Sequence, residues 1–491
     1  MSSIKKNLAY NMFYQILAIV LPLITAPYVS RVLGAKGVGV YSYTYSIANY
    51  FMLFTMLGIS NHGNRSIAAT RKTKKDLGKC FINNYLIQLL FGIFVTISYV
   101  VYVYLFGGSN RPYAWIQVFV VLSGVLDINW FFWGIEKFKL TVIRNTVCKV
   151  FSVICIFLFV RHREDLIIYI VINSLTIFVS QLLLWNFILH EIDFCLPNWN
   201  EIKKNVRPIL ILFLPVLAYS LYRIMAKIMI GIFSSMTEVG YYENAEKILN
   251  IPIGFITALG NVMLPRMSNL LSEGRRDLQK KYIRLSFIFV SIVEGALCFG
   301  ISSVSLSFSV VYYGQEFGET GQILQFMIFT ALISGWANVI RTQYLIPMKL
   351  DSVYVVSMLV AALVNFVLNL IFIPSFGAQG ALIGTVSAEL IVLIIQAVSI
   401  RKSFEWRKII KENSPFILIG LFMLIVVRLE NKILAYSDIL NLMVQILTGS
   451  LIYISITIVV IFITKNLIYQ NIIMLFDKYK NKIYSRYKTG L

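Results

Sequence analysis

Long apolar segments alternate with short polar ones along the whole chain. Stretches of about 20 mostly apolar residues, the length at which an α-helix crosses a bilayer, recur roughly fourteen times. The first extends from Leu8 to Val32, which is longer than the apolar core of a signal peptide and is not followed by a typical cleavage pattern. No segment between them is long enough for a soluble domain. The pattern predicts an all-α integral membrane protein with about 14 transmembrane helices.

Short glycine-rich turns are expected between helices, at residues 34–39, 107–108 and 377–380 among others. Two turns of the chain resemble each other. Residues 37–43 and 238–244 both place a glycine and tyrosines at the start of a helix, 201 residues apart. Carriers often contain such internal repeats and bind their substrate between the two halves. We therefore expect an N-terminal lobe of helices 1–6 at residues 1–207 and a C-terminal lobe of helices 7–12 at 208–412. An extra helix pair and a basic tail follow at 413–491.

The first helix of each expected lobe contains prolines. They are Pro22 and Pro27 in one lobe, and Pro208 and Pro215 in the other. An interior proline removes a backbone hydrogen bond and bends the helix. The bend can be a fixed kink or a hinge for alternating access, and both interpretations stay open.

The composition agrees with a membrane protein and its charges indicate an orientation. Hydrophobic residues make up 58% of the 491 residues and charged residues 14%, whereas soluble domains carry about 25% charged residues. The net charge is +21. If the N-terminus is cytoplasmic, 34 of the 44 lysines and arginines fall in inward-facing segments and 7 in outward turns. Cytoplasmic loops are enriched in these residues, so we expect both termini in the cytoplasm and no nucleic-acid partner.

Sequence signatures of catalysis are absent. There is no phosphate-binding loop, no nucleophile elbow and no zinc-protease motif. The five cysteines include no C-x-x-C pair and the three histidines are scattered, so we expect no metal and no cofactor. A membrane-embedded glycosyltransferase or polymerase normally needs a large outward loop, and every expected outward turn is short. We expect a carrier and not an enzyme.

Two cations within one apolar segment are candidates for substrate binding. Arg223 and Lys227 are four residues apart and so share one face of helix seven. A cation at the centre of a membrane helix costs about 2.5–3.5 kcal/mol, so both should face the bundle interior. They either line a site for an anionic headgroup or form ion pairs with helix eight. Lys227 and Glu246 are expected at equal depth, and Glu243 and Lys247 can pair one turn apart.

Further candidates lie at or inside apolar segments. Arg31 is expected near the outer end of helix one, where an arginine can also extend to the interface. Acidic residues that either bind protons or sodium ions or pair locally are Asp127, Glu246, Glu294 and Glu389. Aromatic residues near helix ends, expected mainly as interfacial anchors, are Tyr113, Trp115, Trp130 and Trp133.

Several motifs resemble the polysaccharide transporter family of the multidrug, oligosaccharidyl-lipid and polysaccharide exporter superfamily. They occur in order between Lys5 and Glu405, and none is found in the last two helices. The motifs are Arg31-Val-Leu-Gly-Ala-Lys-Gly-Val-Gly-Val-Tyr41, Leu57-Gly-Ile-Ser-Asn-His-Gly-Asn-Arg65, Trp130-Phe-Phe-Trp-Gly-Ile-Glu136, Gly240-Tyr-Tyr-Glu-Asn-Ala-Glu-Lys247, Leu264-Pro-Arg-Met-Ser268 and Pro374-Ser-Phe-Gly-Ala-Gln-Gly-Ala381.

The resemblance implies a function as a flippase in a bacterial cell membrane. It implies a two-lobed bundle with a central cavity that opens alternately to each side. The implied cargo is an oligosaccharide on undecaprenyl pyrophosphate, destined for capsule or another surface polysaccharide. Arg223, Lys227, Arg31 and Lys247 would then contact the headgroup. Membrane lipids, a proton or sodium ion, glycosyltransferases and a polymerase are the implied partners, and the alternative is a cation-coupled drug or metabolite antiporter.

Overall fold

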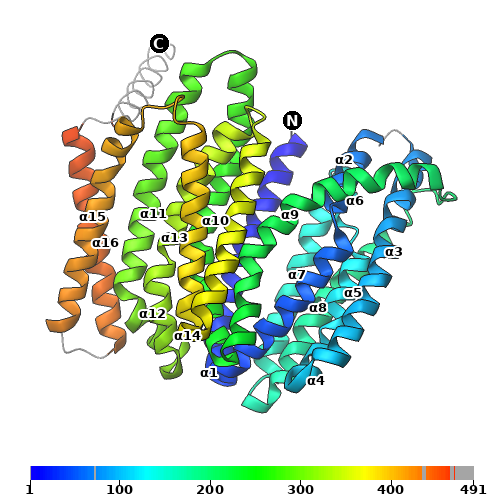
Figure 1. The fold of residues 1–491 in the computed structure, drawn as a ribbon, viewed down its shortest axis with the longest axis horizontal. Coiled ribbons are helices and arrows are strands. Elements are labelled where there is room, and N and C mark those ends of the chain that lie inside the picture. Colours follow the sequence, from blue (N-terminus) through cyan, green and yellow to red (C-terminus); the bar gives the residue numbers. More distant parts are fainter. Residues whose placement is uncertain (1, 71–72, 434–437, 465–468, 470–491) are drawn as a thin grey trace, which may run out of the picture. The chain divides into compact units, whose positions relative to one another are not determined.

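The computed structural model describes residues 2–70, 73–433, 438–464 and 469. Within these residues the regular elements are the helices α1 to α16, joined by short turns of 3₁₀- or π-helix (Figure 1). The all-α fold class expected from the apolar pattern is confirmed.

The α-helices follow one another with short connections. Their bounds are α1 (Ser2–Met56), α2 (Ile59–Thr70), α3 (Lys74–Phe106), α4 (Arg111–Ile116), α5 (Val118–Leu126), α6 (Asn129–Gly134), α7 (Phe138–Phe159), α8 (Leu166–Ile188), α9 (Trp199–Phe233), α10 (Met236–Ser272), α11 (Arg276–Tyr313), α12 (Gly318–Met327), α13 (Phe329–Ile340), α14 (Asp351–Ser399), α15 (Trp406–Ile433) and α16 (Asp438–Thr464).

Two helices are too long for a single membrane crossing and are sharply broken at a glycine. α1 has 55 residues and α14 has 49, whereas about 20 residues cross a bilayer. α1 breaks at Gly34, where φ is 69°, and α14 breaks at Gly377, where φ is 54°. Glycine adopts positive φ without the clash that a Cβ causes. Each helix therefore consists of two arms, and both breaks fall in the glycine-rich turns expected from the sequence.

The number of spans agrees with the expectation. Within the described residues, eleven helical segments are long and apolar enough to cross a membrane, and the bent helix α9 gives a twelfth. Counting the two arms of α1 and of α14 separately brings the twelve to the expected fourteen. α9 also contains Pro208 and Pro215, and its bend lies after both, between Ala218 and Arg223.

The chain packs into two compact units, each described here by itself. Unit 1 comprises the chain up to Ile248 together with Tyr312–Ile323 and Ala361–Ala388. Unit 2 comprises Leu249–Val311, Leu324–Val360 and the chain from Glu389 onward. Unit 1 thus includes ends of helices that the sequence assigns to the second lobe. The sequence repeat predicts lobes at 1–207 and 208–412, followed by an extra helix pair and tail at 413–491. This division remains a prediction.

The core of unit 1 corrects one expectation. Trp130 is fully buried, stacks on Phe81 and donates a hydrogen bond from its indole nitrogen to Gln88 at 3.1 Å. It was expected at the membrane interface because it lies near a helix end. The short helix α6 instead turns it into the bundle, among the buried residues Ile128, Phe131 and Phe132.

The last two helices belong to the core of unit 2. Phe416 and Met423 of α15 and Tyr453 of α16 pack with Phe299 of α11 in one apolar cluster. The Tyr453 hydroxyl donates to the backbone carbonyl of Ile292 at 2.9 Å. α15 and α16 therefore pack against the middle of α11.

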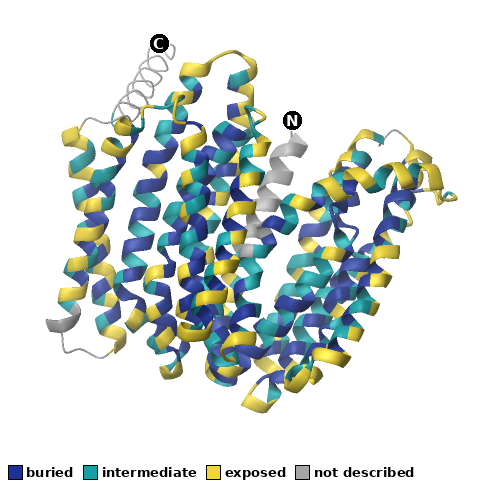
Figure 2. Cartoon of the chain, viewed as in Figure 1, coloured by how far each residue is buried: buried dark blue, intermediate teal, exposed yellow. Residues whose placement is uncertain are grey.

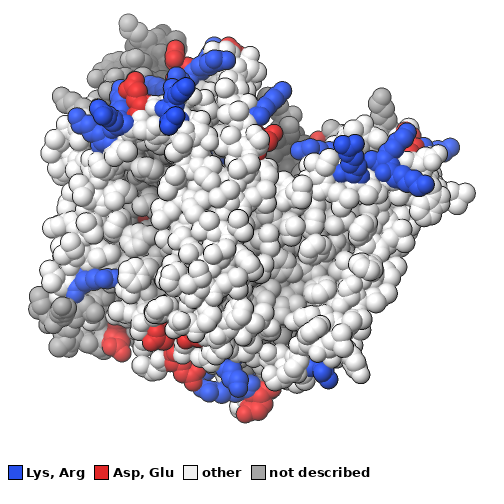
Figure 3. All heavy atoms as spheres, in the orientation of Figure 1, with Lys and Arg blue, Asp and Glu red and all other residues white. Residues whose placement is uncertain are grey.

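Apolar side chains dominate the outward faces of both units. Large residues such as Phe94, Phe106 and Phe462 are more than half exposed, and Figure 2 shows exposed positions on outward helix faces. On the face in Figure 3, the basic residues of unit 1 gather where α2 ends and where α3 and α9 begin. Those of unit 2 gather where α10 ends and α11 begins. An apolar surface with charges at helix ends is that of a multi-pass membrane protein.

Candidate functional site

Lys227 lies in an ion-pair cluster between α9 and α10. Its ammonium group is 3.0 Å from a carboxylate oxygen of Glu243 and 3.0 Å from one of Glu246, and the three side chains are 14–16% exposed. An unpaired cation is costly within a membrane span. The two carboxylates remove that cost. The expected pair with Glu246 is confirmed, and Glu243 is a second partner.

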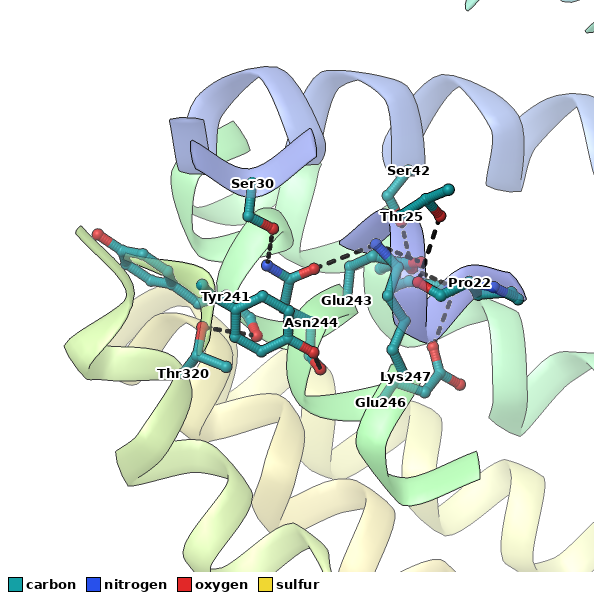
Figure 4. Close-up of polar contacts among 12 residues, drawn as sticks. Pro22, Thr25, Ser30, Ser42, Tyr241, Glu243, Asn244, Glu246, Lys247 and Thr320 are labelled. Atoms are coloured by element: carbon teal, nitrogen blue, oxygen red, sulfur yellow. Dashed lines mark hydrogen bonds and ion pairs between the residues drawn. The ribbon is translucent and has the colours of Figure 1, made fainter. Parts of the chain in front are cut away.

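Lys247 extends the cluster along α10. Its ammonium group donates to the side-chain oxygen of Asn244 at 3.1 Å and lies 3.9 Å from Glu243, which confirms the expected pair one turn apart. From α1, the Ser42 hydroxyl donates to Glu243 at 2.7 Å (Figure 4). Glu243 therefore contacts two lysines and one hydroxyl and is the centre of the cluster.

Arg223 is a third basic residue beside this cluster. It is partly buried and lies one turn before Lys227 on α9. The charges of Lys227 and Lys247 balance those of Glu243 and Glu246.

The two repeated turns recognised in the sequence pack directly against each other. A Cβ on Gly39 would lie 1.6 Å from the backbone oxygen of Met236, and a Cβ on Gly240 would lie 2.0 Å from that of Ala35. Only glycine permits this approach of α1 and α10. Gly39 and Gly240 are 201 residues apart, as are the bonded Ser42 and Glu243. The repeat therefore forms an internal contact between the two halves of the sequence.

Both broken helices present a backbone N–H to a carboxylate just after the glycine. The Ala35 N–H donates to Glu316 at 3.4 Å, and the Ala378 N–H donates to Glu238 at 2.9 Å. Each acceptor thus lies at the N-terminal end of a second arm, where the helix dipole favours negative charge. Arg163 also forms an ion pair with Glu316. We call this part of unit 1, residues 31–44, 163, 236–247, 313–322 and 377–385, the glycine-turn end.

Buried hydrogen bonds tie the start of α10 to other helices of the glycine-turn end. The Asn244 amide donates to Ser30 of α1 at 2.8 Å, and its backbone carbonyl accepts from the Tyr313 hydroxyl at 2.9 Å (Figure 4). The hydroxyls of Tyr242 and Thr385 are 2.8 Å apart. Segments far apart in the sequence are therefore held together here.

The other expected site residues lie outside this cluster of charges. Arg31 is exposed beside Gly314. Asp127 accepts hydrogen bonds from the backbone and side-chain nitrogens of Asn129 at 2.8 and 2.7 Å, which is a local role at the start of α6. Glu294 and Glu389 are buried and belong to unit 2. The structure thus brings together Lys227, Lys247 and Glu246 of the eight expected residues, with Arg223 one turn away.

Sequence reasoning missed several polar residues that hold the site. Ser30 and Tyr313 gave no signal. Asn244 lies in the second repeated turn, and Ser42 and Glu243 occupy matching positions of the two repeats. Arg144 was counted among cytoplasmic charges, yet it is buried in unit 1. It donates to the Ser180 carbonyl and to the side chains of Gln181, Asn129 and Asn145. The spacing of residues along the sequence does not reveal these hydrogen-bond partners, because they lie on three different helices.

No group of three or more histidine, cysteine, aspartate or glutamate residues within the described ranges could hold a metal ion. The cluster chemistry is that of lysine, arginine and carboxylate, and it suits the binding of an anion by charge and hydrogen bonds.

Residues 4–271, more than half of the chain, match the family described as polysaccharide biosynthesis protein. The chain belongs to this family. The resemblance to polysaccharide transporters drawn from the motifs is confirmed. The "Putative O-antigen transporter" of Shigella dysenteriae is 22% identical over 391 residues, covering 77% of this chain and 96% of the relative. The protein of the same name in Escherichia coli (strain K12) is 21% identical over 409 residues, covering 82% and 97%.

Solved structures support the fold. The lipid II flippase MurJ in an inward closed conformation superposes with a TM-score of 0.72 at 16% identity, covering 94% of this chain and 99% of that one. An inward-facing multidrug resistance MATE family transporter of the MOP superfamily gives 0.57 at 14% identity, covering 81% and 99%. These relatives are named as transporters and flippases, in agreement with the expectation of a carrier and not an enzyme.

Proposed function

We propose that this family member is a flippase for oligosaccharides linked to undecaprenyl pyrophosphate. It moves them from the cytoplasmic to the outer leaflet of a bacterial cell membrane for capsule or other surface polysaccharide. The family match over residues 4–271 carries the proposal. The names of the two relatives and the fold shared with a lipid II flippase support it.

The cluster at α9 and α10 suits a pyrophosphate headgroup. Arg223 lies one turn before Lys227 on α9, and a guanidinium group can hold phosphate oxygens with two donors at once. Lys227 already has two carboxylate partners at 3.0 Å. We therefore assign headgroup contact first to Arg223, then to Lys247 and Arg31, and give Lys227 the role of ordering Glu243 and Glu246.

In an alternating-access mechanism, the glycine-turn end would act as the outer gate, the part that opens and closes the path to the outside. The charge bias favours an outside location for residues 34–39, and in this proposal the N–H bonds to Glu316 and Glu238 hold that end closed. An outward-open state would have to break contacts such as that of Ser30 with Asn244. Glycosyltransferases and a polymerase would supply and use the cargo on the two sides of the membrane.

Deletion of the gene in its bacterial host tests the function. We expect surface polysaccharide to be lost and lipid-linked repeat units to accumulate on the cytoplasmic side. A plasmid copy of the wild-type gene should reverse both effects. Unchanged surface polysaccharide with increased sensitivity to cationic drugs would instead identify the alternative, a drug or metabolite antiporter.

A further inference from the structure

Glu294 lies near the middle of α11, inside unit 2. α11 extends from Arg276 to Tyr313, so the residue is about 27 Å from either end at 1.5 Å per residue. That distance is close to half the length of the helix. The carboxyl group is therefore remote from the polar ends of the span.

The carboxyl group is buried without a compensating charge. The residue is 1% exposed, and its Oε2 has no hydrogen-bond partner. No ion pair in the described part of the chain includes it. Glu246 has Lys227, and Asp127 accepts from Asn129. Glu294 differs from both of these expected coupling residues in having a buried oxygen without a partner.

The helices packed around this position offer it no cation. Residues 324–340 of α12 and α13, 413–427 of α15 and 439–464 of α16 contain no lysine, arginine, aspartate or glutamate. Titratable groups close to this position include the thiol of Cys298, one turn along α11, and the hydroxyl of Tyr453 on α16, which lies beside Gly295. Neither supplies a positive charge.

Neighbouring polar groups on the same stripe of α11 already have partners. The Trp336 indole donates to Ser291 at 3.1 Å, the Cys298 thiol donates to the Ile328 carbonyl at 3.1 Å, and Ser302 donates to the Gln325 carbonyl at 2.8 Å. These hydrogen bonds hold α11 against the break between α12 and α13. Glu294 is the carboxyl-bearing member of this stripe, and its neighbours leave few oxygens for a metal cation, which binds several.

We infer that Glu294 is a proton-binding site, occupied by a proton when α11 is packed against α13 as in this structure. An unpaired carboxylate cannot remain ionised in such surroundings without large cost, whereas a neutral carboxyl group can. Release of the proton requires water or a cation to reach Oε2, and therefore requires α11 to separate from the helices that bury it. Proton binding is thus linked to the packing of unit 2. The inference holds for any cargo, so it goes beyond the proposed function.

Infrared spectroscopy of the purified full-length protein in lipid at neutral pH tests the site directly. A protonated carboxyl group and a carboxylate absorb at different frequencies. The spectrum of wild type minus Glu294→Gln should contain one protonated-carboxyl band. Glu246→Gln is the matched control, because its ion pair with Lys227 should give a carboxylate signal in the same subtraction. Glutamine has the shape of protonated glutamate, so the melting temperature of Glu294→Gln should stay near that of wild type.

Two outcomes would overturn the inference. One is a carboxylate signal from Glu294 at neutral pH. The other is loss of its protonated band when sodium chloride replaces choline chloride at constant pH, which would identify a sodium site. Labelling of wild type by dicyclohexylcarbodiimide, which attacks protonated carboxyl groups in apolar surroundings, needs no variant. We expect adduct on the peptide with Glu294 and a rate that falls as pH rises. None of these results depends on transport, so failure of the flippase proposal would be seen separately.

Discussion

Removing the ammonium group of Lys227 should destabilise the protein strongly. Lys227 is 3.0 Å from both Glu243 and Glu246, and the side chains are 14–16% exposed. In Lys227→Ala, Glu243 keeps Ser42 at 2.7 Å and Lys247 at 3.9 Å. Glu246 loses its ion pair. Stranding one partner of a buried pair costs roughly 3–5 kcal/mol, and the slight exposure places the expected loss near the lower value.

A second substitution separates a stranded charge from lost packing. Adding Glu246→Ala to Lys227→Ala removes the unpaired carboxylate, so most of the lost stability should return. The exposed pair of Lys79 and Glu201, 2.7 Å apart with side chains 47% and 40% exposed, provides the control. Surface pairs contribute about 0–1 kcal/mol, so Lys79→Ala should be nearly neutral.

The assay is protein abundance in the membrane together with the melting temperature in detergent. Lys227→Ala should lower both, and the double variant should recover most of each. If Lys227→Ala is as mild as Lys79→Ala, or if the double variant is no better than the single one, the ion-pair cluster does not stabilise the fold.

Three further predictions concern topology, the close helix contact and the headgroup. A cysteine at Lys36 should react with an impermeant reagent in intact cells, whereas one at Lys204 should react only after the membrane is opened; the reverse result would invert the orientation. Gly39→Ala puts a Cβ 1.6 Å from the Met236 oxygen, so it should force α1 and α10 apart and lower the melting temperature by several degrees; an unchanged value would contradict the contact. Arg223→Ala should abolish transport at near-normal abundance, and Arg223→Lys should retain part of it; equal loss of abundance and transport in Arg223→Ala would make Arg223 structural.

The sequence was sufficient for the features that depend on local pattern. Apolar length predicted the spans, and glycine-rich turns predicted where α1 and α14 reverse at Gly34 and Gly377. The ion pair of Lys227 with Glu246 was predicted because the two residues are almost equally far from the turn between their helices. The constant rise per residue of a helix then places them at nearly the same depth in the membrane.

Features that depend on how distant helices meet could not be predicted. The burial of Trp130 and Arg144 is set by neighbours on other helices, and their positions near helix ends suggested an interface. Ser30 and Asn244 are 214 residues apart, and no periodicity relates them. The sequence placed Glu294 near the middle of an apolar segment. That its Oε2 has no hydrogen-bond partner could be recognised only from the structure, which shows the helices that pack around it.

The most direct test of the proposed function is transport by the purified protein in liposomes. Lipid-linked oligosaccharide extracted from a deletion strain of the host would be reconstituted with wild type, with Arg223→Ala or without protein. A membrane-impermeant oxidant of sugars would then report how much cargo reaches the opposite leaflet over time. We expect rapid exchange with wild type, and little above the protein-free rate with Arg223→Ala. Wild type that exchanges the cargo no faster than protein-free liposomes would contradict the claim that this chain is a flippase for lipid-linked oligosaccharide.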